Sequence, residues 1–303
     1  MEIHGEPTRR KRSFYILRHL RGELPLGISF WINYIGGVNF FALFSILLVR
    51  AAKGFDLVAQ SYVALPYFLS ILVVFPWVMV GTWRSASRYA TSGGTRFWSW
   101  ATKLIILVGL YYWGNMVVNQ TIPSIGVFSG IITGDKGYPP YDMLVNNHGR
   151  IIQFHGGLRA GAEREFKRKM DSSSHLRVLQ IESHGGRATA GMRIGRMIRR
   201  ARLVTVVSTY CESAATYLFI SGEQRIVTPG AKIGFHASSG IGGSDAEDVR
   251  HFMEEAGIST NFINKVLSTS PDQMWYPTHE EMIQAGVVTG ELVDGKIQWE
   301  SPR

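Results

Sequence analysis

Two glycines at the end of a short apolar run could present a backbone N–H to a reacting group. They lie in the segment Glu182–Gly186 (ESHGG), between the run Leu176–Ile181 and a helical pattern. Glycine permits positive φ, which turns the chain sharply and exposes an N–H toward a bound group. Taken alone, such a pair is usually an ordinary turn, so its chemical interpretation depends on the neighbouring segments.

A serine lies at the next junction between a strand and a helix. The segment Tyr210–Thr216 (YCESAAT) contains Ser213, followed by Ala214. A hydroxyl on such a turn is exposed, and the first amides of the following helix have no internal partner, so they favour a developing negative charge. Taken alone, Ser213 is interpreted as a helix N-cap, a position that serine prefers.

A histidine ends the third segment, Gly234–His236. Histidine is the side chain best able to take a proton from serine near neutral pH and to return it to a leaving group. The chain contains nine histidines, and a lone histidine is more often a structural or surface residue. His236 therefore gains its interest from its order and spacing relative to the other two segments.

Together the three segments resemble a known family. The runs IESHGGRATAGMRIGRMI, CESAAT and GEQRIVTPGAKIGFH resemble, in this order, the proteolytic subunit of Clp protease (ClpP). That fold lies within the crotonase-like superfamily and near the SppA-type signal peptide peptidases. The resemblance covers about residues 142–290, including a closing segment Trp275–Val288. It implies a serine peptidase domain.

The resemblance also implies a role for each matching residue. Ser213 would attack the substrate carbonyl, and His236 would act first as a base and then as an acid. The N–H groups of Gly186 and Ala214 would form the oxyanion hole. Loss of one such donor typically costs about 3–4 kcal/mol of transition-state stabilisation, so the glycines should matter nearly as much as the serine.

The acid that orients the histidine is the point at which this chain departs from the family. Clp proteolytic subunits carry an aspartate just before their closing segment, where this chain has Met274. Asp272, two residues earlier, is the candidate third catalytic residue. The alternatives are Asp245, Asp248 and Glu280, or a Ser-His dyad without an acid.

Cys211 and Lys232 are the other reactive groups near these residues. Cys211 is the single cysteine, which excludes an internal disulfide and a Cys-cluster metal site. Free cysteine is among the most buried residue types, so we expect Cys211 to be buried rather than nucleophilic. SppA-type peptidases use a lysine base, but Lys232 lies four residues before His236 on the same strand and has no equivalent claim. We expect neither a metal ion nor a cofactor.

An alternation of strands and helices must position these residues. A hairpin is expected where Asn146–Arg150 separates Met143–Val145 from Ile151–Phe154. Beyond it, helical patterns over Glu163–Met170 and Gly191–Arg202 alternate with short apolar runs. This order indicates βαβ units and a largely parallel sheet.

The N-terminal 134 residues differ in character, because three long stretches contain no charged residue. They are Leu24–Val49, Leu57–Trp83 and Leu104–Gly134. A bilayer core of about 30 Å requires about 20 apolar residues in a helix, so each stretch is long enough to span it. The first is longer than the core of a cleavable signal peptide and fits an anchor better. We expect the third to leave the membrane near Pro123.

The flanking Lys and Arg residues indicate the orientation of these spans. Six precede the first stretch, two lie between the first and the second, and four lie between the second and the third. This distribution predicts that the N-terminus and the second loop are cytoplasmic. Three spans then put the residues after about 135 on the outer side, in the periplasm or outside the cell.

Basic residues also concentrate in the C-terminal half. Between Arg159 and Arg202, twelve Lys and Arg residues accompany four acids, within a chain of net charge +9. Nucleic-acid binding is one interpretation, but the expected outer location and the lack of interleaved aromatic residues argue against it. Contact with anionic membrane lipid and ordinary solvated helix faces are the remaining interpretations.

These observations predict an N-terminal transmembrane helical region fused to an α/β domain of ClpP/crotonase-like fold. The expected boundaries are a basic N-terminus over 1–23, three transmembrane helices over 24–134 and the α/β domain over 135–303. We expect a serine hydrolase that cleaves peptides near the outer bilayer surface, with a homo-oligomer as a candidate assembly. The chain has no GxxxxGK[ST] motif, and a Clp-like ATPase partner is hard to reconcile with an outer location, so we expect cleavage without ATP. The alternatives are a non-catalytic binding or assembly module with this fold, and a crotonase-type acyl-CoA enzyme.

Overall fold

The computed structural model describes residues 14–52, 54–238 and 246–299, in two compact units. The first unit contains the described residues up to Gly54 together with Ala64–Ile125. The second contains Phe55–Val63 and the described residues from Gly126 onward. Residues 1–13, with four of the six basic residues expected before the first span, lie outside the described residues.

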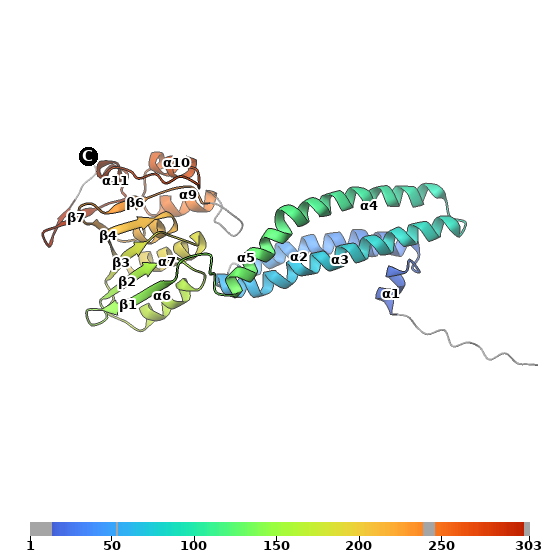
Figure 1. Cartoon of the computed structure of the whole chain (residues 1–303), viewed down its shortest axis with the longest axis horizontal. Coiled ribbons are helices and arrows are strands. Elements are labelled where there is room, and N and C mark those ends of the chain that lie inside the picture. Colours follow the sequence, from blue (N-terminus) through green and yellow to red (C-terminus); the bar gives the residue numbers. More distant parts are fainter. Residues whose placement is uncertain (1–13, 53, 239–245, 300–303) are drawn as a thin grey trace, which may run out of the picture. The chain divides into compact units, whose positions relative to one another are not determined.

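The N-terminal part of the chain is helical (Figure 1). Its elements are α1 (Tyr15–Leu20), the π-helical stretch η1 (Ile28–Gly36), α2 (Gly37–Ala52), α3 (Leu57–Thr91), α4 (Arg96–Met116), the π-helical stretch η2 (Val117–Thr121) and α5 (Ile122–Ile132). Three helical runs are long and apolar enough to cross a membrane: Ile28–Ala51, Leu57–Thr91 and Arg96–Ile132. The three helices expected from the charge-free stretches are therefore present.

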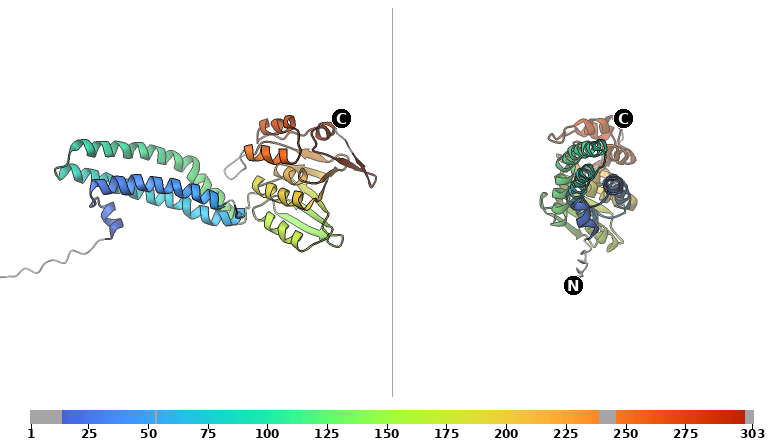
Figure 2. Two further views of the ribbon diagram at one scale, coloured as in Figure 1. Left: turned by 180° about the vertical axis from the view of Figure 1, so that it is seen from behind. Right: turned by 90° about the vertical axis from the view of Figure 1, so that its right-hand side faces the viewer.

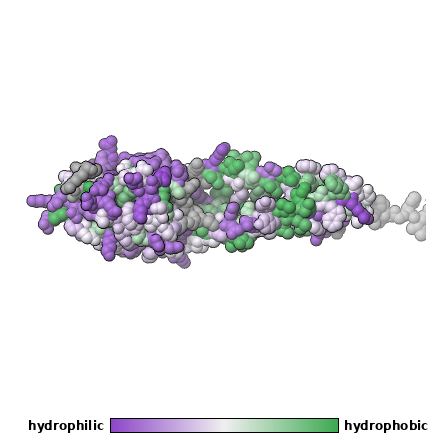
Figure 3. Space-filling model, turned by 90° about the horizontal axis from the view of Figure 1, so that it is seen from above, coloured by the Kyte–Doolittle hydropathy of each residue, from purple (hydrophilic) through white to green (hydrophobic). Residues whose placement is uncertain are grey.

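The apolar side chains of these helices point mostly outward. Only 6%, 17% and 11% of the most apolar part of each run is buried. Large apolar surface without a protein partner is what a lipid-facing helix presents. Figure 3 shows this contrast in surface character: apolar residues gather over the helices, whereas hydrophilic residues dominate the same face of the α/β domain.

The third apolar helix continues to Ile132, past Pro123, the residue near which we expect the chain to leave the membrane. Pro123 is the second residue of α5 and follows the π-helical stretch η2. Within a regular α-helix proline removes one N–H and clashes with the carbonyl four residues earlier. The wider π-helical turn directly before α5 reduces that conflict, so the helix is not broken.

Close contacts between small and polar residues join the helices of the first unit. The Tyr34 hydroxyl donates to the carbonyl of Ile105 at 3.4 Å. Gly109 faces this hydroxyl, and a Cβ at that position would collide with it. The hydroxyls of Ser29 and Ser85 are 2.8 Å apart. Small residues that allow close approach and hydroxyls that bond across helices are typical of packing in membranes.

The C-terminal part is an α/β domain. Its elements are β1 (Tyr141–Asn146), β2 (Ile151–Gly156), α6 (Ala162–Asp171), β3 (Val178–Ser183), α7 (Ala188–Ala201), β4 (Val204–Glu212), the 3₁₀ helix η3 (Ser213–Ala215), α8 (Thr216–Phe219), β5 (Gln224–Val227), β6 (Lys232–Gly234), α9 (Ala246–Glu255), α10 (Thr260–Ser268), α11 (His279–Gln284), β7 (Gly290–Val293) and β8 (Lys296–Trp299). The predicted alternation of strands and helices is confirmed.

One largely parallel sheet runs through this domain. Among the described residues it has eight strands, in the order β1-β2-β3-β4-β5-β7-β8, with β6 also paired to β4. Only the two outer pairs, β1 with β2 and β7 with β8, are antiparallel. The pairing of β1 with β2 is the predicted hairpin. Its turn contains Asn147, His148 and Gly149, all with positive φ, which asparagine and glycine adopt most readily.

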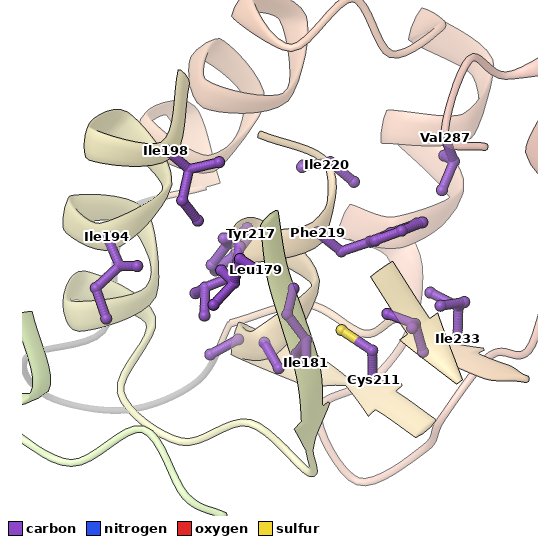
Figure 4. Packing of buried hydrophobic residues seen from close by; sticks show 14 of the residues in the cluster. Leu179, Ile181, Ile194, Ile198, Cys211, Tyr217, Phe219, Ile220, Ile233 and Val287 are labelled. Carbon is purple, nitrogen blue, oxygen red and sulfur yellow. The ribbon is translucent and has the colours of Figure 1, made fainter. Parts of the chain in front are cut away.

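Helices cover one face of the sheet (Figures 1 and 2). Side chains along a strand alternate between its two faces, and in β3 Leu179 and Ile181 are buried. Ile194 and Ile198 of α7 lie in the same core cluster (Figure 4). The apolar stripe of α7 therefore holds this helix against β3, which fixes the point where the β3–α7 connection passes β4.

Candidate active site

Ser213 lies on a strained turn at the end of β4. It is the first residue of η3, and its φ is +53°, in the left-handed region. A residue other than glycine pays about 1–2 kcal/mol for that conformation, and such strain is common at functional sites. The turn is held by its surroundings: Cys211 and Ala214 on either side are buried, and the Thr216 hydroxyl donates to the Ser213 carbonyl at 2.7 Å.

The Gly-Gly segment forms the tight connection between β3 and α7. The N–H of Gly185 donates to the Ser183 hydroxyl at 3.0 Å, and the two glycines have φ of +93° and +143°. Leu158 bonds the Gly185 carbonyl and the Arg187 N–H, each at 2.8 Å. Because N–H groups alternate in direction along an extended segment, the N–H of Gly186 points away from Leu158.

The structure brings this connection into contact with the Ser213 turn. A Cβ added to Gly185 would lie 2.7 Å from the Glu212 carbonyl oxygen, 2.8 Å from the Ser213 Cβ and 2.9 Å from the Ala214 N. The backbone of Gly185 therefore lies directly against the turn. A negative charge that develops beside Ser213 could accept from the N–H groups of Gly186 and Ala214, which is the arrangement of an oxyanion hole.

His236 follows β6, whose strand runs parallel to the last part of β4. Glu212 of β4 is in register with Gly234 of β6, so Ser213 and His236 both follow the same end of the paired strands. Nδ1 of His236 lies 2.7 Å from the Ala237 carbonyl oxygen. A carbonyl can only accept, so Nδ1 is the donor, and in the neutral form of the ring Nε2 has the lone pair that a base requires.

The described part of the chain contains no hydrogen bond between the Ser213 hydroxyl and His236. Catalytic hydrogen bonds are often long in a ligand-free enzyme and tighten when substrate binds. The register of β4 and β6 places both residues just beyond the same end of the two strands, without a bond between them in the described structure.

The candidate acids lie on the surface. Asp272 is exposed, and its hydrogen bond within the described chain is made by its backbone N–H, to Ser270. Asp248 and Glu280 are also exposed, and Asp245 lies outside the described residues. The Ala237 carbonyl, rather than one of these carboxylates, contacts Nδ1 of His236.

Met274, where the resemblance implied an aspartate, packs against β6. A Cβ on Gly234 would meet the Met274 Cγ and Sδ at 2.8 Å. The segment is fixed by Trp275, which exchanges two backbone hydrogen bonds with Phe235. An apolar side chain therefore occupies the place beside the strand that leads to His236. At the other end of that strand, Lys232 is exposed and in register with Tyr210.

Cys211 is fully buried in the core of the domain, as expected (Figure 4). Burial, with a smaller contribution from the nearby Glu212 carboxylate, raises the pKa of its thiol. The thiolate is the nucleophilic form of cysteine, so Cys211 is unreactive at neutral pH.

Glu212 is a contact residue that the sequence did not indicate. One of its carboxylate oxygens lies 2.6 Å from Nδ1 of His184, and the other accepts from the Tyr276 hydroxyl at 2.8 Å. The His184 ring in turn stacks on Tyr210, with centroids 4.1 Å apart. Glu212 directly precedes Ser213, so these two hydrogen bonds connect the Ser213 turn to His184, the residue before Gly185, and to Tyr276 of the closing segment. Its neighbour Ser213 was the only sequence signal, because these partners are distant in sequence.

A cavity of about 270 Å³ lies on the sheet face opposite α6 and α7, and Ser213 is not among its described lining residues. Polar side chains of β2 and β3 line much of it: Gln153 and Gln180 are hydrogen bonded at 2.7 Å, and His155 lies 3.4 Å from Glu182. Among the described residues, no group of three or more His, Cys, Asp and Glu side chains could hold a metal ion.

The Clp protease family model matches residues 168–282. This segment runs from α6 to α11 and contains Ser213 and His236, so the α/β domain has a ClpP-like fold.

Two solved structures illustrate the likeness. ClpP1 from Listeria monocytogenes aligns with a TM-score of 0.42 and 19% identity, over 49% of this chain and 93% of that chain. A point mutant of the same protein aligns with a TM-score of 0.39 and 19% identity, over 48% and 91%. A search of curated proteins found no match.

Substituting Gly185 by alanine tests the contact between the two turns. The added Cβ would overlap the Glu212, Ser213 and Ala214 backbone region, and displacement of an oxyanion donor costs about 10²–10³-fold in rate. We therefore expect at least about a 100-fold slower reaction of Gly185→Ala with a fluorophosphonate probe. Gly230→Ala is the matched control, because Gly230 also has positive φ (+84°) but no neighbour within 4 Å. Equal labelling rates for the two variants would contradict the interpretation of the Gly185–Gly186 turn as part of an oxyanion hole beside Ser213.

Proposed function

We propose that this chain is a membrane-anchored serine peptidase with Ser213 as its nucleophile. The proposal is carried by one observation: in a domain that matches the Clp protease family, the Gly185–Gly186 turn lies directly against the strained turn that holds Ser213. A strained nucleophile beside free backbone donors is what acyl transfer requires.

In the proposed reaction the Ser213 Oγ attacks the scissile carbonyl carbon, and Nε2 of His236 takes the hydroxyl proton. The N–H groups of Gly186 and Ala214 stabilise the oxyanion of the tetrahedral intermediate. His236 then protonates the leaving amine, and an acyl-serine remains. A water molecule attacks this ester, with His236 again first base and then acid, and the carboxylic acid product leaves with Ser213 restored.

Asp272 is the proposed third residue, and a Ser-His dyad is the alternative. In the structure the Ala237 carbonyl accepts from Nδ1–H of His236 and so already holds the tautomer in which Nε2 is free. For Asp272 to replace it, the segment 270–273 would have to carry an exposed carboxylate toward the ring.

A covalent probe tests this function. We expect a fluorophosphonate to label the full-length wild type and not Ser213→Ala, and to label His236→Ala at least about 100-fold more slowly because the general base is lost. Ser208→Ala is the matched control, because Ser208 is an exposed serine on the same strand β4, and it should label like the wild type. Slower labelling of Asp272→Ala would support the triad, whereas an unchanged rate would support the dyad.

Absence of labelling in a folded wild type would favour a second function, a non-catalytic binding module. The observation that supports a binding module is that the described structure has no hydrogen bond between Ser213 and His236. The crotonase-type alternative has no comparable support from the geometry.

The proposal includes an outer, periplasmic or extracellular location for residues after about 135, with boundaries at 23/24 and 134/135. It rests on the distribution of Lys and Arg around three spans. Two variants with one added cysteine each test it, because the native Cys211 is buried and silent toward thiol reagents. A membrane-impermeant maleimide added to intact cells should label Ser268→Cys, and should label Ser92→Cys only after permeabilisation. Both positions are exposed in the structure. The opposite pattern would invert the orientation.

We further propose that the protein acts on peptides without ATP, assembles as a homo-oligomer and contacts anionic lipid. The lipid contact would involve α6. Its residue Glu163 accepts from the N–H of Leu57 at 3.4 Å, at the start of an apolar helix, and Arg164 lies 3.5 Å from Asp56. The exposed Lys167 and Arg168 follow on the same helix. These charges therefore lie near one end of a spanning segment, where headgroups are expected.

Native mass spectrometry of the detergent-solubilised full chain measures the number of copies per particle and the lipid that remains bound. We expect more than one copy per particle and retained phosphatidylglycerol. The double variant Lys167→Gln/Arg168→Gln should retain less lipid, and Arg202→Gln, a control that removes one exposed charge on another element, should not. A monomer that retains the same lipid in all variants would remove both parts of the proposal.

A further inference from the structure

A buried ion pair joins the linker after the third apolar helix to the Gly-Gly turn. The Arg187 guanidinium bonds Asp135 twice, from Nε to Oδ2 at 2.8 Å and from Nη2 to Oδ1 at 2.5 Å. The side chains are only 12% and 3% exposed. The N–H of Ala160 also donates to Oδ2 at 2.9 Å. Burial opposes ionisation of Asp135, but the bonds and charge of Arg187 outweigh it and lower the pKa of this carboxyl.

Asp135 is fixed to the last turn of α5. The N–H of Asp135 donates to the Gly130 carbonyl at 2.8 Å, and the N–H of Gly134 donates to the Ile131 carbonyl at 3.2 Å. Gly134 has φ of +100°. These are the two bonds and the left-handed glycine of a Schellman cap, a rigid helix end. The carboxylate therefore has a defined position relative to this turn.

Arg187 is fixed to the Gly-Gly turn. It follows Gly186 directly, precedes the first residue of α7, and donates its own N–H to Leu158. The residues after Asp135 are also fixed, because the Arg159 side chain donates to the carbonyls of Tyr138 and Pro139. The guanidinium also lies over the Tyr138 ring, 5.4 Å from its centroid. The proposed oxyanion donor, Gly186, is thus one residue from a buried, bidentate tether.

We propose that the Asp135–Arg187 pair is a positioning device that sets the N–H of Gly186 for oxyanion binding by tying the Gly-Gly turn to the end of α5. The inference rests on the proposed function of Ser213 and adds two residues that do not touch substrate. A planar, bidentate arginine–carboxylate pair restricts both distance and angle, and an error of about 1 Å in a catalytic group can cost about 100-fold in rate. Arg187 lies within the first run that carries the resemblance, directly after Gly186, whereas Asp135 lies outside the residues that the resemblance covers.

The test uses the full-length protein in lipid nanodiscs with four variants. Asp135→Asn removes the charge, Arg187→Lys keeps the charge but loses the fork, and the double variant Asp135→Arg/Arg187→Asp reverses the pair. Glu255→Gln is the matched control, because it breaks another ion pair of the same domain, Arg199–Glu255 at 2.8 Å, away from the turn. Hydrolysis of a fluorogenic peptide and backbone hydrogen exchange are measured for each.

We expect Asp135→Asn to lower kcat about 10- to 100-fold with KM changed less than about threefold, because the oxyanion forms only after substrate binds. Arg187→Lys should fall between wild type and Asp135→Asn, the reversed pair should regain part of kcat, and Glu255→Gln should match the wild type. Exchange should accelerate in the peptide spanning 183–190 and not in the peptide of α10.

Three results would overturn the inference: wild-type kcat and exchange in folded Asp135→Asn, a loss expressed in KM alone, or equally faster exchange in both peptides. If Asp135→Asn fails to fold, Arg187→Lys decides by the same criteria. A wild type that neither hydrolyses peptides nor reacts with a fluorophosphonate refutes the proposed function instead. In that case the exchange of the 183–190 peptide still decides whether the pair positions the turn.

Discussion

The candidate site depends on one steric constraint, which is that no side chain fits between the β3–α7 connection and its neighbours. A Cβ at Gly185 would meet the Ser213 turn, and a Cβ at Gly186 would meet the Leu158 backbone. On the other side of the turn, a Cβ at Gly191 of α7 would lie 2.6 Å from the Ala214 carbonyl oxygen. Glycine at these positions lets three backbone segments approach closely, so that main-chain N–H groups, rather than flexible side chains, surround the serine.

The stability of this arrangement comes from the parallel sheet and its apolar layer. The register of β4 with β3 on one side and with β6 on the other fixes where the Gly-Gly turn, Ser213 and His236 begin. Buried neighbours on β4 and α8 then hold Ser213 at positive φ. A residue with an unfavourable backbone conformation persists only where the surrounding packing determines it. The geometry of the candidate site is therefore a consequence of core packing at the end of β4.

Two sets of charged side chains contact the turns around Ser213. Glu212 binds His184 and Tyr276 at the surface, whereas Asp135 and Arg187 form a buried ion pair. The exposed contact is screened by water and contributes little to stability. The buried pair is costly to desolvate but also costly to break, so it restricts geometry more than it adds stability. It is the stronger constraint on the turn.

The sequence alone determined the membrane region, the α/β class and the segments that form the site, because these follow from local patterns. Charge-free stretches of more than 20 residues predict spanning helices. Turn residues predict the β1–β2 hairpin, and glycines and serine at strand ends mark the two turns. Only the tertiary structure decided which groups meet.

Long-range contacts are of three kinds: the pairing of both β5 and β6 with β4, the partners of Glu212, and the Asp135–Arg187 pair. They join residues up to 64 positions apart. Such contacts depend on strand register and helix packing, which one-dimensional periodicity does not encode, and Asp135 and Arg187 look like ordinary surface charges until the fold buries them.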